Sequence, residues 1–90
     1  MSRVAREVPI LNRRGLHARA SAKFVTLAAQ QPTEVRVEKD GSTVTGTSIM
    51  GLMMLGAAMG DTITIHCEGA ASDAALQQMV ALVEERFGEE

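Results

Sequence analysis

Three short segments of this chain alternate apolar and polar residues, and that period of two restricts it to folds built on a half-exposed β-sheet. The segments are residues 4–11, 34–39 and 62–67. Successive side chains of a strand point to opposite faces, so each segment has one apolar and one polar face. In the first segment Val4, Val8 and Ile10 share a face, although Arg6 interrupts the pattern. Pro9 has no N–H to donate, which predicts that this strand lies at a sheet edge.

A hairpin and a regular apolar face extend this sheet. Asp40-Gly41 is a strong signal for a tight hairpin turn, so residues 42–45 are expected to return as a fourth, short strand. In residues 62–67 the apolar face consists of Ile63, Ile65 and Cys67. Antiparallel sheets can expose one face to water. We therefore predict four antiparallel strands with one wet face.

The segments between the strands have the period of a helix. Residues 18–29 place an apolar stripe at Ala20, Phe24, Leu27 and Ala28. Pro32 disfavours helical backbone in the residue before it, so this helix is expected to end at residues 30–32. Residues 49–55 are expected to form a short apolar helix that ends near Gly56, followed by a turn at residues 60–61.

A last helix is expected after a loop at residues 69–72. Ser72 or Asp73 can cap it, and Gly88 suits its C-terminal end. Its buried stripe is expected to comprise Leu76, Met79, Val80, Val83 and Phe87. The acidic residues near the end are interpreted as a solvated face and tail: Glu84, Glu85, Glu89 and Glu90.

The element order is thus β-α-β-β-α-β-α. This order predicts an α+β, two-layer, open-faced sandwich with a four-stranded antiparallel sheet and three helices on one face. Ninety residues without an internal repeat or linker indicate a single domain, residues 1–90.

Composition and charge exclude several classes of function. The net charge is −2 and the chain has two aromatic residues, both phenylalanine, which argues against nucleic-acid binding through a patch of Arg13, Arg14 and Lys23. The single cysteine allows no internal disulfide and fits a reducing compartment. Neither a secretory signal nor a membrane-spanning run is apparent. We expect a cytoplasmic protein that does not insert into a membrane.

The segment Gly15-Leu16-His17-Ala18-Arg19 carries the chemistry. His17 lies where a loop turns into a helix, and the N–H groups of Ala18 and Arg19 at a helix start attract anions. Histidine is nucleophilic near neutral pH, and an arginine can bind phosphate oxygens. Gly15 allows an unusual backbone angle or a close approach. Arg13, Arg14 and Lys23 lie nearby in the sequence. From spacing alone, two interpretations of these cations are about equally good: an anion-attracting rim around a phosphorylatable imidazole, or a solvated loop and helix face.

The same residues, followed by Ser21-Ala22-Lys23-Phe24-Val25, resemble the active-site signature of HPr, the histidine-containing phosphocarrier family of the bacterial phosphotransferase system. Residues 47–56 resemble the regulatory-serine segment of that family, and the element order is also the family's. Two motifs at matching separation make the resemblance specific, and it extends over nearly the whole chain.

This resemblance implies a relay protein that needs no cofactor or metal and does not act on a small molecule. His17 would take a phosphoryl group on Nδ1 from phosphorylated enzyme I and pass it to a histidine of an EIIA-type protein. Arg19 would contact the phosphate, and the backbone of Ala18 and Arg19 would bind it. The partner-binding residues would be Gly15, Ala18, Arg19, Ala22, Lys23, Ile49, Met50 and Met53. We expect a monomer.

Ser48 has two compatible interpretations. By position it is an N-cap serine of the short helix. By resemblance it is a regulatory site for an HPr kinase/phosphorylase, where an added phosphate would weaken docking of enzyme I. The helix itself is apolar all round, so we expect Leu52 and Leu55 to face the core. Ile49, Met50 and Met53 are then exposed, and flexible methionines suit a surface that docks several partners. The alternative interpretation of these methionines is filler in an alanine-rich core.

Three other features complete the expectations. The family usually has proline after the arginine, where this chain has Ala20. With alanine at this position, the chain is more similar to the nitrogen-related, regulatory branch of the family than to the sugar-transport branch. His66 and Cys67 are adjacent on a strand and point to opposite faces, so we expect no shared metal site, with Cys67 in the core. The alternative function is a regulatory docking module whose phosphorylation state controls its partners.

Overall fold

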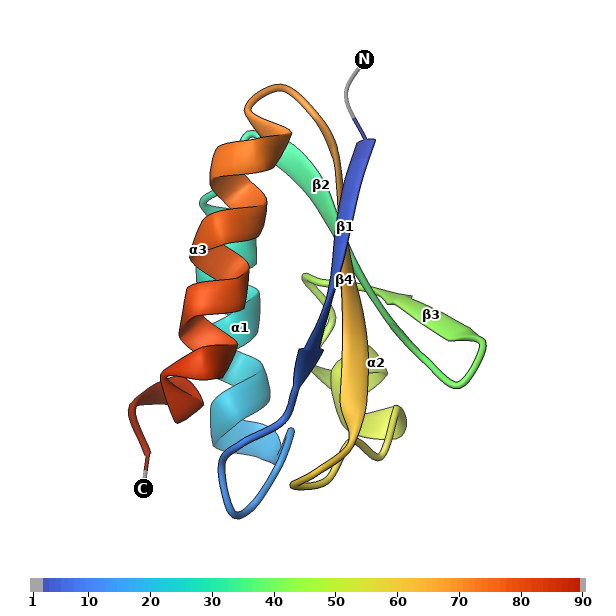
Figure 1. Ribbon diagram of the computed structural model, residues 1–90, viewed down its shortest axis with the longest axis vertical. Coiled ribbons are helices and arrows are strands. Elements are labelled where there is room, and N and C mark those ends of the chain that lie inside the picture. The colour runs from blue at the N-terminus through green and yellow to red at the C-terminus, as the bar shows by residue number, and fades with distance from the viewer. Residues whose placement is uncertain (1–2, 90) are drawn as a thin grey trace.

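Four strands form one antiparallel sheet in the order β1-β4-β2-β3 in the computed structural model, which describes residues 3–89. The strands are β1 (Arg3–Pro9), β2 (Thr33–Lys39), β3 (Ser42–Thr45) and β4 (Thr62–Gly69). The helices are α1 (Ala18–Ala29), α2 (Ile49–Met54) and α3 (Ser72–Glu84), followed by a 3₁₀ turn at Arg86–Gly88. The expected order of elements, the antiparallel sheet and the open-faced sandwich are confirmed (Figure 1).

The sheet follows the alternation in the sequence. β1 lies at an edge, as Pro9 predicted, and β4 pairs with both β1 and β2. Ile63, Ile65 and Cys67 point inward and are fully buried. The β2–β3 hairpin turns at Asp40 and Gly41, which both have positive φ, at 51° and 84°. This pair of left-handed residues matches the twist of a two-residue hairpin.

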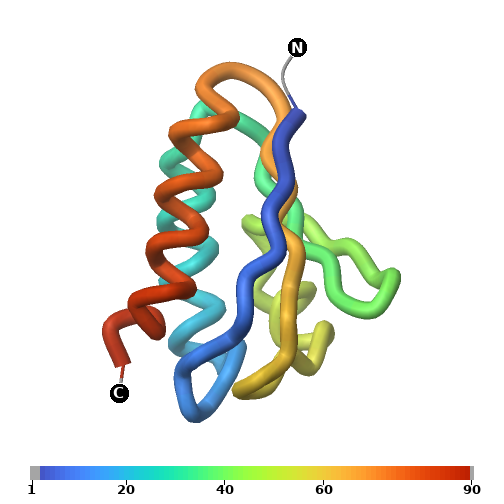
Figure 2. Tube along the Cα trace, in the orientation of Figure 1, coloured from blue at the N-terminus to red at the C-terminus, as the bar shows by residue number. Residues whose placement is uncertain are grey.

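The helices cover one face of the sheet. α1 and α3 run side by side, with the sheet along their flank (Figures 1 and 2). α2 packs against α1 and next to β3. Phe24, Met79 and Leu52 bring one fully buried side chain from each helix into a shared core. Leu27, Leu55 and Leu76 are only partly buried at its margin. None of the helices within residues 3–89 is long and apolar enough to cross a membrane.

Two expectations for the last helix were wrong. Neither Ser72 nor Asp73 caps it, because the helix begins at Ser72 itself, after Ala71 in a left-handed conformation with φ of 56°. The hydroxyl of Ser72 is buried and has no partner within the described residues. The helix also stops at Glu84 instead of continuing to Phe87. Phe87 still reaches the core, because the chain reverses through positive φ at Arg86 and Phe87 and turns its ring inward.

The two serines at helix starts lead to a first prediction. The Ser48 hydroxyl accepts a hydrogen bond from the N–H of Gly51 at 2.9 Å, which makes it the N-cap of α2. Ser48→Ala should cost about 1 kcal/mol of unfolding free energy in urea titrations, the usual value of a lost N-cap. Ser72→Ala is the matched control and should cost almost nothing, since its hydroxyl makes no hydrogen bond. An equal loss at both positions would contradict the assignment.

Candidate functional site

His17 is the N-cap residue of α1, at the point where the loop after β1 turns into the helix. Its carbonyl accepts the first helical hydrogen bond, from the N–H of Ser21 at 2.9 Å. The Ser21 hydroxyl donates to the carbonyl of Leu16 at 3.0 Å and ties the loop to the helix. The His17 side chain makes no cap hydrogen bond. The N–H groups of the first turn therefore lack side-chain caps and can bind an anion.

Gly15 fixes the path of this loop in both of the ways that its sequence position predicted. Its φ is +65°, and a Cβ placed on it would lie 2.3 Å from the carbonyl oxygen of Ala57. The next residue, Leu16, donates its N–H to that same oxygen at 3.0 Å. The loop after β1 is thus pressed against the segment that follows α2. This contact holds the two halves of the expected docking surface together.

The imidazole of His17 is held by Glu89, which lies 72 residues further along the chain. Nε2 of His17 lies 2.6 Å from Oε2 of Glu89, and their side chains are only 15% and 18% exposed. The other carboxylate oxygen, Oε1, accepts a hydrogen bond from Nδ2 of Asn12 at 3.0 Å. A carboxylate accepts hydrogen bonds only, so the proton of this contact sits on Nε2. The lone pair of a neutral ring is then left on Nδ1.

Glu89 had been interpreted as part of a solvated acidic tail, and that expectation was wrong. The chain after α3 is anchored by the buried ring of Phe87, and the carbonyl of Phe87 accepts a hydrogen bond from Nζ of Lys23 at 2.7 Å. The N–H of Glu89 donates to the carbonyl of Arg86 at 2.8 Å. In the sequence, the only local indication that the chain turns back here is an apolar residue and a glycine directly after a helix. Glu84 and Glu85 are exposed as expected, and Glu90 lies outside the described residues.

Electrostatics favour the ionised form of Glu89. Burial by itself would raise the pKa of this carboxyl, but hydrogen bonds from Asn12 and His17 and the charges of His17 and Lys23 outweigh burial and lower the pKa below its usual value. The carboxylate is therefore charged at neutral pH. A depressed folded-state pKa stabilises the fold above the usual pKa of a glutamate, and this contribution is lost as pH falls through the lowered value.

Three arginines share a pocket with the carboxylate that holds His17. Arg13, Arg14 and Arg19 line a pocket together with Glu89. All three guanidinium groups are on exposed residues, and within residues 3–89 none of them makes an ion pair. They are available to an incoming anion. Lys23, which was expected in the same rim, is exposed but its ammonium group is engaged with the Phe87 carbonyl.

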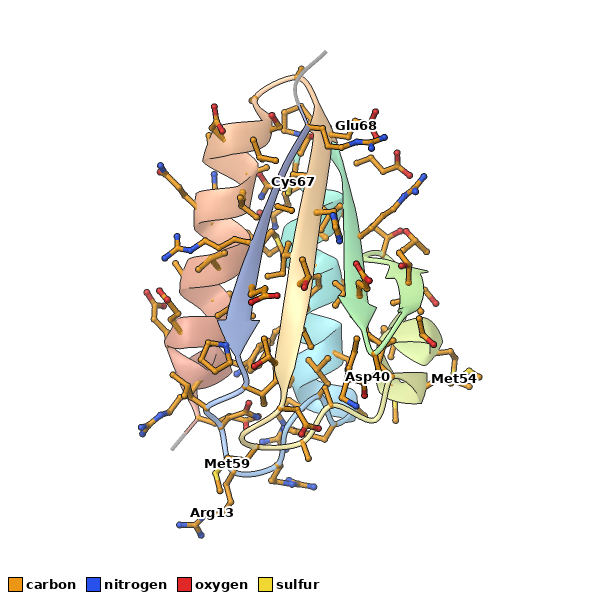
Figure 3. All side chains as sticks on the ribbon, turned by 45° about the vertical axis from the view of Figure 1, so that its right-hand side comes forward. Arg13, Asp40, Met54, Met59, Cys67 and Glu68 are labelled. Carbon is orange, nitrogen blue, oxygen red and sulfur yellow. The ribbon has the colours of Figure 1, made fainter. Side chains whose placement is uncertain are left out.

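An apolar patch lies on α2. Ile49, Met50 and Met53 are exposed and Leu52 is fully buried, as the sequence predicted. Met54, which was not singled out, is the most exposed of these residues at 80%, compared with 69% for Met50. It follows Met50 by four residues and therefore lies on the same side of the helix. Figure 3 shows Met54 projecting outward on α2.

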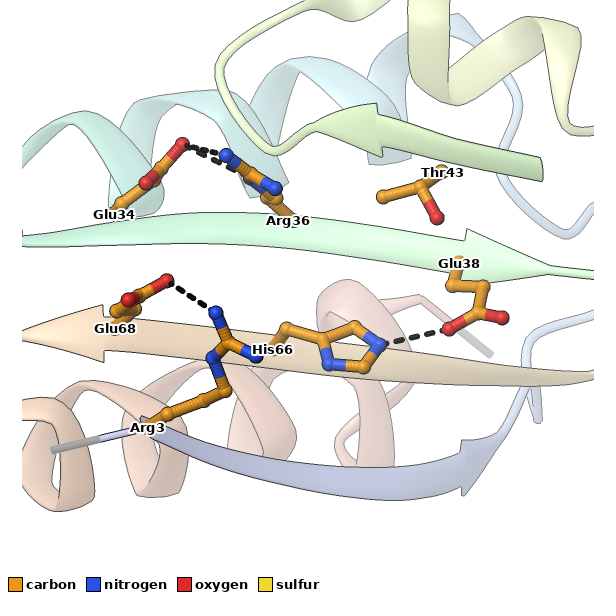
Figure 4. A pocket seen from close by; sticks show the side chains of 7 residues that line it. All are labelled: Arg3, Glu34, Arg36, Glu38, Thr43, His66 and Glu68. Atoms are coloured by element: carbon orange, nitrogen blue, oxygen red, sulfur yellow. Dashed lines mark hydrogen bonds and ion pairs between the residues drawn. The ribbon is translucent and has the colours of Figure 1, made fainter. Parts of the chain in front are cut away.

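The second histidine lies on the opposite, open face of the sheet. Nε2 of His66 is 2.8 Å from Oε1 of Glu38. Around it, Arg36 pairs with Glu34, and Arg3 with Glu68 (Figure 4). All of these side chains come from the strands β1, β2 and β4, so this histidine has no helix start beside it to bind an anion. Cys67 faces the core, where burial raises the pKa of its thiol. No cluster of three or more metal-ligating side chains exists within residues 3–89.

Comparisons with known proteins find similar chains over nearly the whole length of this one. The family model described as PTS HPr component phosphorylation site matches residues 4–85. The chain is 48% identical to the phosphocarrier protein HPr of Pseudomonas aeruginosa, over 94% of this chain and 96% of that protein. It is 39% identical to the phosphocarrier protein NPr of Shewanella violacea, over 99% of this chain and 98% of the relative.

Solved structures are similar throughout. HPr-C-His from Thermoanaerobacter tengcongensis superposes with a TM-score of 0.89 at 40% identity, covering 100% of this chain and 99% of the other. The phosphocarrier protein HPr of Bacillus anthracis superposes with a TM-score of 0.87 at 38% identity, over 92% and 99% of the two chains. A further relative at 40% identity, over 90% of this chain and 96% of its own length, is the HPr-like protein Crh of Halalkalibacterium halodurans.

Proposed function

This chain belongs to the HPr family of the bacterial phosphotransferase system, and on that premise we propose that it relays a phosphoryl group between proteins on Nδ1 of His17. The observation that carries the proposal is the arrangement of the ring. Nε2 is held by Glu89 at 2.6 Å, which leaves Nδ1 as the nucleophile beside the uncapped start of α1.

The surroundings suit a carrier that must release what it binds. The first-turn N–H groups and the guanidinium of Arg19 can each bind a phosphate oxygen. Both lie at the surface, where water weakens their hold on an anion. A deep, enclosed phosphate site would stabilise the phosphorylated state and slow its transfer. Phosphate contacts that lie at the surface favour exchange between partners instead.

We propose enzyme I as the donor and an EIIA-type protein as the acceptor. Relatives named HPr and a relative named NPr both match nearly the whole chain. Offering a sugar-specific and a nitrogen-related acceptor together would identify the branch of the family. If Ala20 marks the nitrogen-related branch, the nitrogen-related acceptor is expected to take most of the phosphate. We propose that the chain acts as a monomer in the cytoplasm, with its single cysteine as a buried thiol.

Incubation with phosphoenolpyruvate, magnesium and enzyme I tests the proposal. The chain should gain one phosphate that is lost in acid and retained in alkali, as expected for a phosphohistidine. Intact-mass spectrometry before and after brief acid treatment measures both properties. A chain that takes no phosphate, or takes one that survives acid, would rule the relay out.

We further propose that Ser48 is a regulatory phosphorylation site. Its hydroxyl caps α2 and is only partly buried, next to the exposed Met50. A phosphate on Ser48 would be stabilised by the helix start and would add negative charge to an apolar docking surface. An HPr kinase/phosphorylase with ATP should phosphorylate Ser48 and slow later labelling of His17 by enzyme I. Unchanged His17 labelling after complete Ser48 phosphorylation would refute this.

The exposed apolar patch also supports the alternative function, a regulatory docking module. Met50→Asp places a charge at the centre of the patch and should weaken enzyme I binding at least tenfold, because a desolvated charge is costly in an apolar interface. Gln77→Asp, on the exposed surface of α3, is the matched control and should bind normally. Titration calorimetry measures both. If the Met50 variant binds as tightly as the control, the patch is not the docking surface.

Met50→Asp also distinguishes the relay function from the docking-module function. A relay loses labelling by enzyme I in Met50→Asp but keeps it when a small chemical phosphoryl donor is used. A docking module loses its effect on partner proteins even when His17 is fully phosphorylated by the chemical donor.

A further inference from the structure

The contact between His17 and Glu89 joins a buried framework to the reacting ring. Asn12 is fully buried, and its Nδ2 donates both to Oε1 of Glu89 at 3.0 Å and to the carbonyl of Gly15 at 2.8 Å. The Glu89 carboxylate is thus hydrogen-bonded to the same loop that positions His17. From the other side, the buried ring of Phe87 anchors the chain two residues before Glu89. Both ends of the contact are held by the core rather than by flexible surface groups.

Positively charged groups lie around the Glu89 carboxylate. Arg13 and Arg14 from the loop and Arg19 from α1 line a pocket with Glu89, and Lys23 of α1 adds a positive charge that acts on its carboxylate. Glu89 is the carboxylate within ion-pair distance of His17. As an ionised hydrogen-bond acceptor 2.6 Å away, it favours a proton on Nε2.

We propose that Glu89 is a positioning residue for phosphoryl transfer, one that keeps a proton on Nε2 of His17 throughout the cycle. This inference rests on the proposed relay function. A neutral ring with its proton on Nε2 presents the Nδ1 lone pair to the donor. Once Nδ1 is phosphorylated the ring is a cation, and Glu89 compensates its charge at 2.6 Å.

The electron balance shows why that proton matters. In the first transfer the Nδ1–P bond forms, the bond from phosphorus to the donor's leaving atom breaks, and its electron pair leaves with the donor. In the second transfer the Nδ1–P bond breaks and its pair returns to Nδ1. With a proton on Nε2, His17 leaves as neutral imidazole, whereas without it the leaving group is an imidazolate anion. Glu89 thus makes the phosphoryl group transferable without moving a proton in either step.

Ring tautomers test the first half of the proposal without any partner protein. In ¹⁵N-histidine-labelled protein, the nitrogen shifts of His17 should show the proton on Nε2. Glu89→Ala should raise the fraction of rings with the proton on Nδ1 several-fold, while Glu89→Gln keeps an acceptor and should lie between. Glu85→Ala, on the exposed residue at the end of α3, is the matched control and should match the parent chain. Tautomers in Glu89→Ala that match the parent chain would overturn the proposal.

The rate at which phosphate is lost tests the second half of the proposal, that the proton stays on Nε2 once Nδ1 is phosphorylated. Phosphoramidate, a small phosphoryl donor, can load His17 directly, and ³¹P NMR follows release. At about pH 8, Glu89→Gln and Glu89→Ala should release phosphate roughly tenfold more slowly, because fewer of their rings are protonated. At about pH 5 all the rings are protonated and the difference should shrink to within about twofold. Circular dichroism establishes that each variant is folded.

A merely structural role predicts the opposite result. If Glu89 only covered the site, its removal would admit water and speed release at both pH values. Release that is equal or faster in the variants at about pH 8 would therefore overturn the proposal. Neither assay uses enzyme I, so failure of the proposed relay would appear separately, as an unlabelled parent chain in the phosphoenolpyruvate assay.

Discussion

His17→Ala is expected to abolish phosphorylation of this chain by phosphoenolpyruvate and enzyme I. Alanine removes the one nucleophile that the site presents, and the remaining groups of the pocket, Arg13, Arg14 and Arg19, bind anions without forming covalent bonds. The fold should survive, because His17 contributes its backbone, not its side chain, to the start of α1. Radiolabel incorporation should fall to background, and circular dichroism should match the parent chain.

His66→Ala is the matched control, since the chain has two histidines. His66 lies on the open face of the sheet, paired with Glu38 and away from the uncapped helix start. Its loss should leave labelling at the parent level. Label that persists in His17→Ala, or disappears in His66→Ala, would place the phosphoryl acceptor elsewhere.

Gly15→Ala is expected to destabilise the fold more than the addition of a single methyl group anywhere else in this loop. The new Cβ would lie 2.3 Å from the Ala57 carbonyl oxygen, a backbone atom that cannot rotate away. The residue must also hold φ at +65°, which is costly for any side chain. Together the clash and the strained backbone should cost about 3 kcal/mol of unfolding free energy in urea titrations followed by circular dichroism.

Gly41→Ala separates these two causes. Gly41 has φ of +84°, but a Cβ there meets no atom within 4 Å. It should therefore cost only the conformational part, about 1 kcal/mol. Equal losses at the two glycines would show that the close approach to Ala57 contributes nothing. Gly15→Ala should also slow labelling of His17 in protein that is still folded, because the loop that positions the imidazole must shift, whereas Gly41→Ala should label normally.

The fold was predictable because local patterns and the global architecture agree. Alternation identified the faces of β2 and β4, Pro9 placed β1 at an edge, and Asp40-Gly41 identified the hairpin. Ser72 shows where such reasoning fails. A serine before an apolar stripe is a good cap by type, but here the N-cap is Ala71, in a left-handed conformation, and the helix begins at Ser72 itself. A backbone conformation of that kind has no signature in the identity of an alanine.

The site was predictable only as far as it is local in sequence. The loop, His17, Ala18 and Arg19 are adjacent, so their chemistry could be inferred before their positions were known. Glu89 and Asn12 join the site through tertiary packing, 72 residues and 5 residues from the histidine. The reversal that delivers Glu89 depends on burying Phe87 after the helix has ended. Glutamate in an acidic tail is ordinarily solvated, and only the fold distinguishes this one.

The most direct test of the relay is to identify the atom that carries the phosphate. The chain, with ¹⁵N-labelled histidine, is phosphorylated by phosphoenolpyruvate and enzyme I and examined by NMR in alkaline buffer, where a phosphohistidine persists. We predict a coupling between phosphorus and Nδ1 of His17, with Nε2 still facing Glu89. Phosphate on Nε2 of His17, on His66 or on a serine hydroxyl would contradict the account.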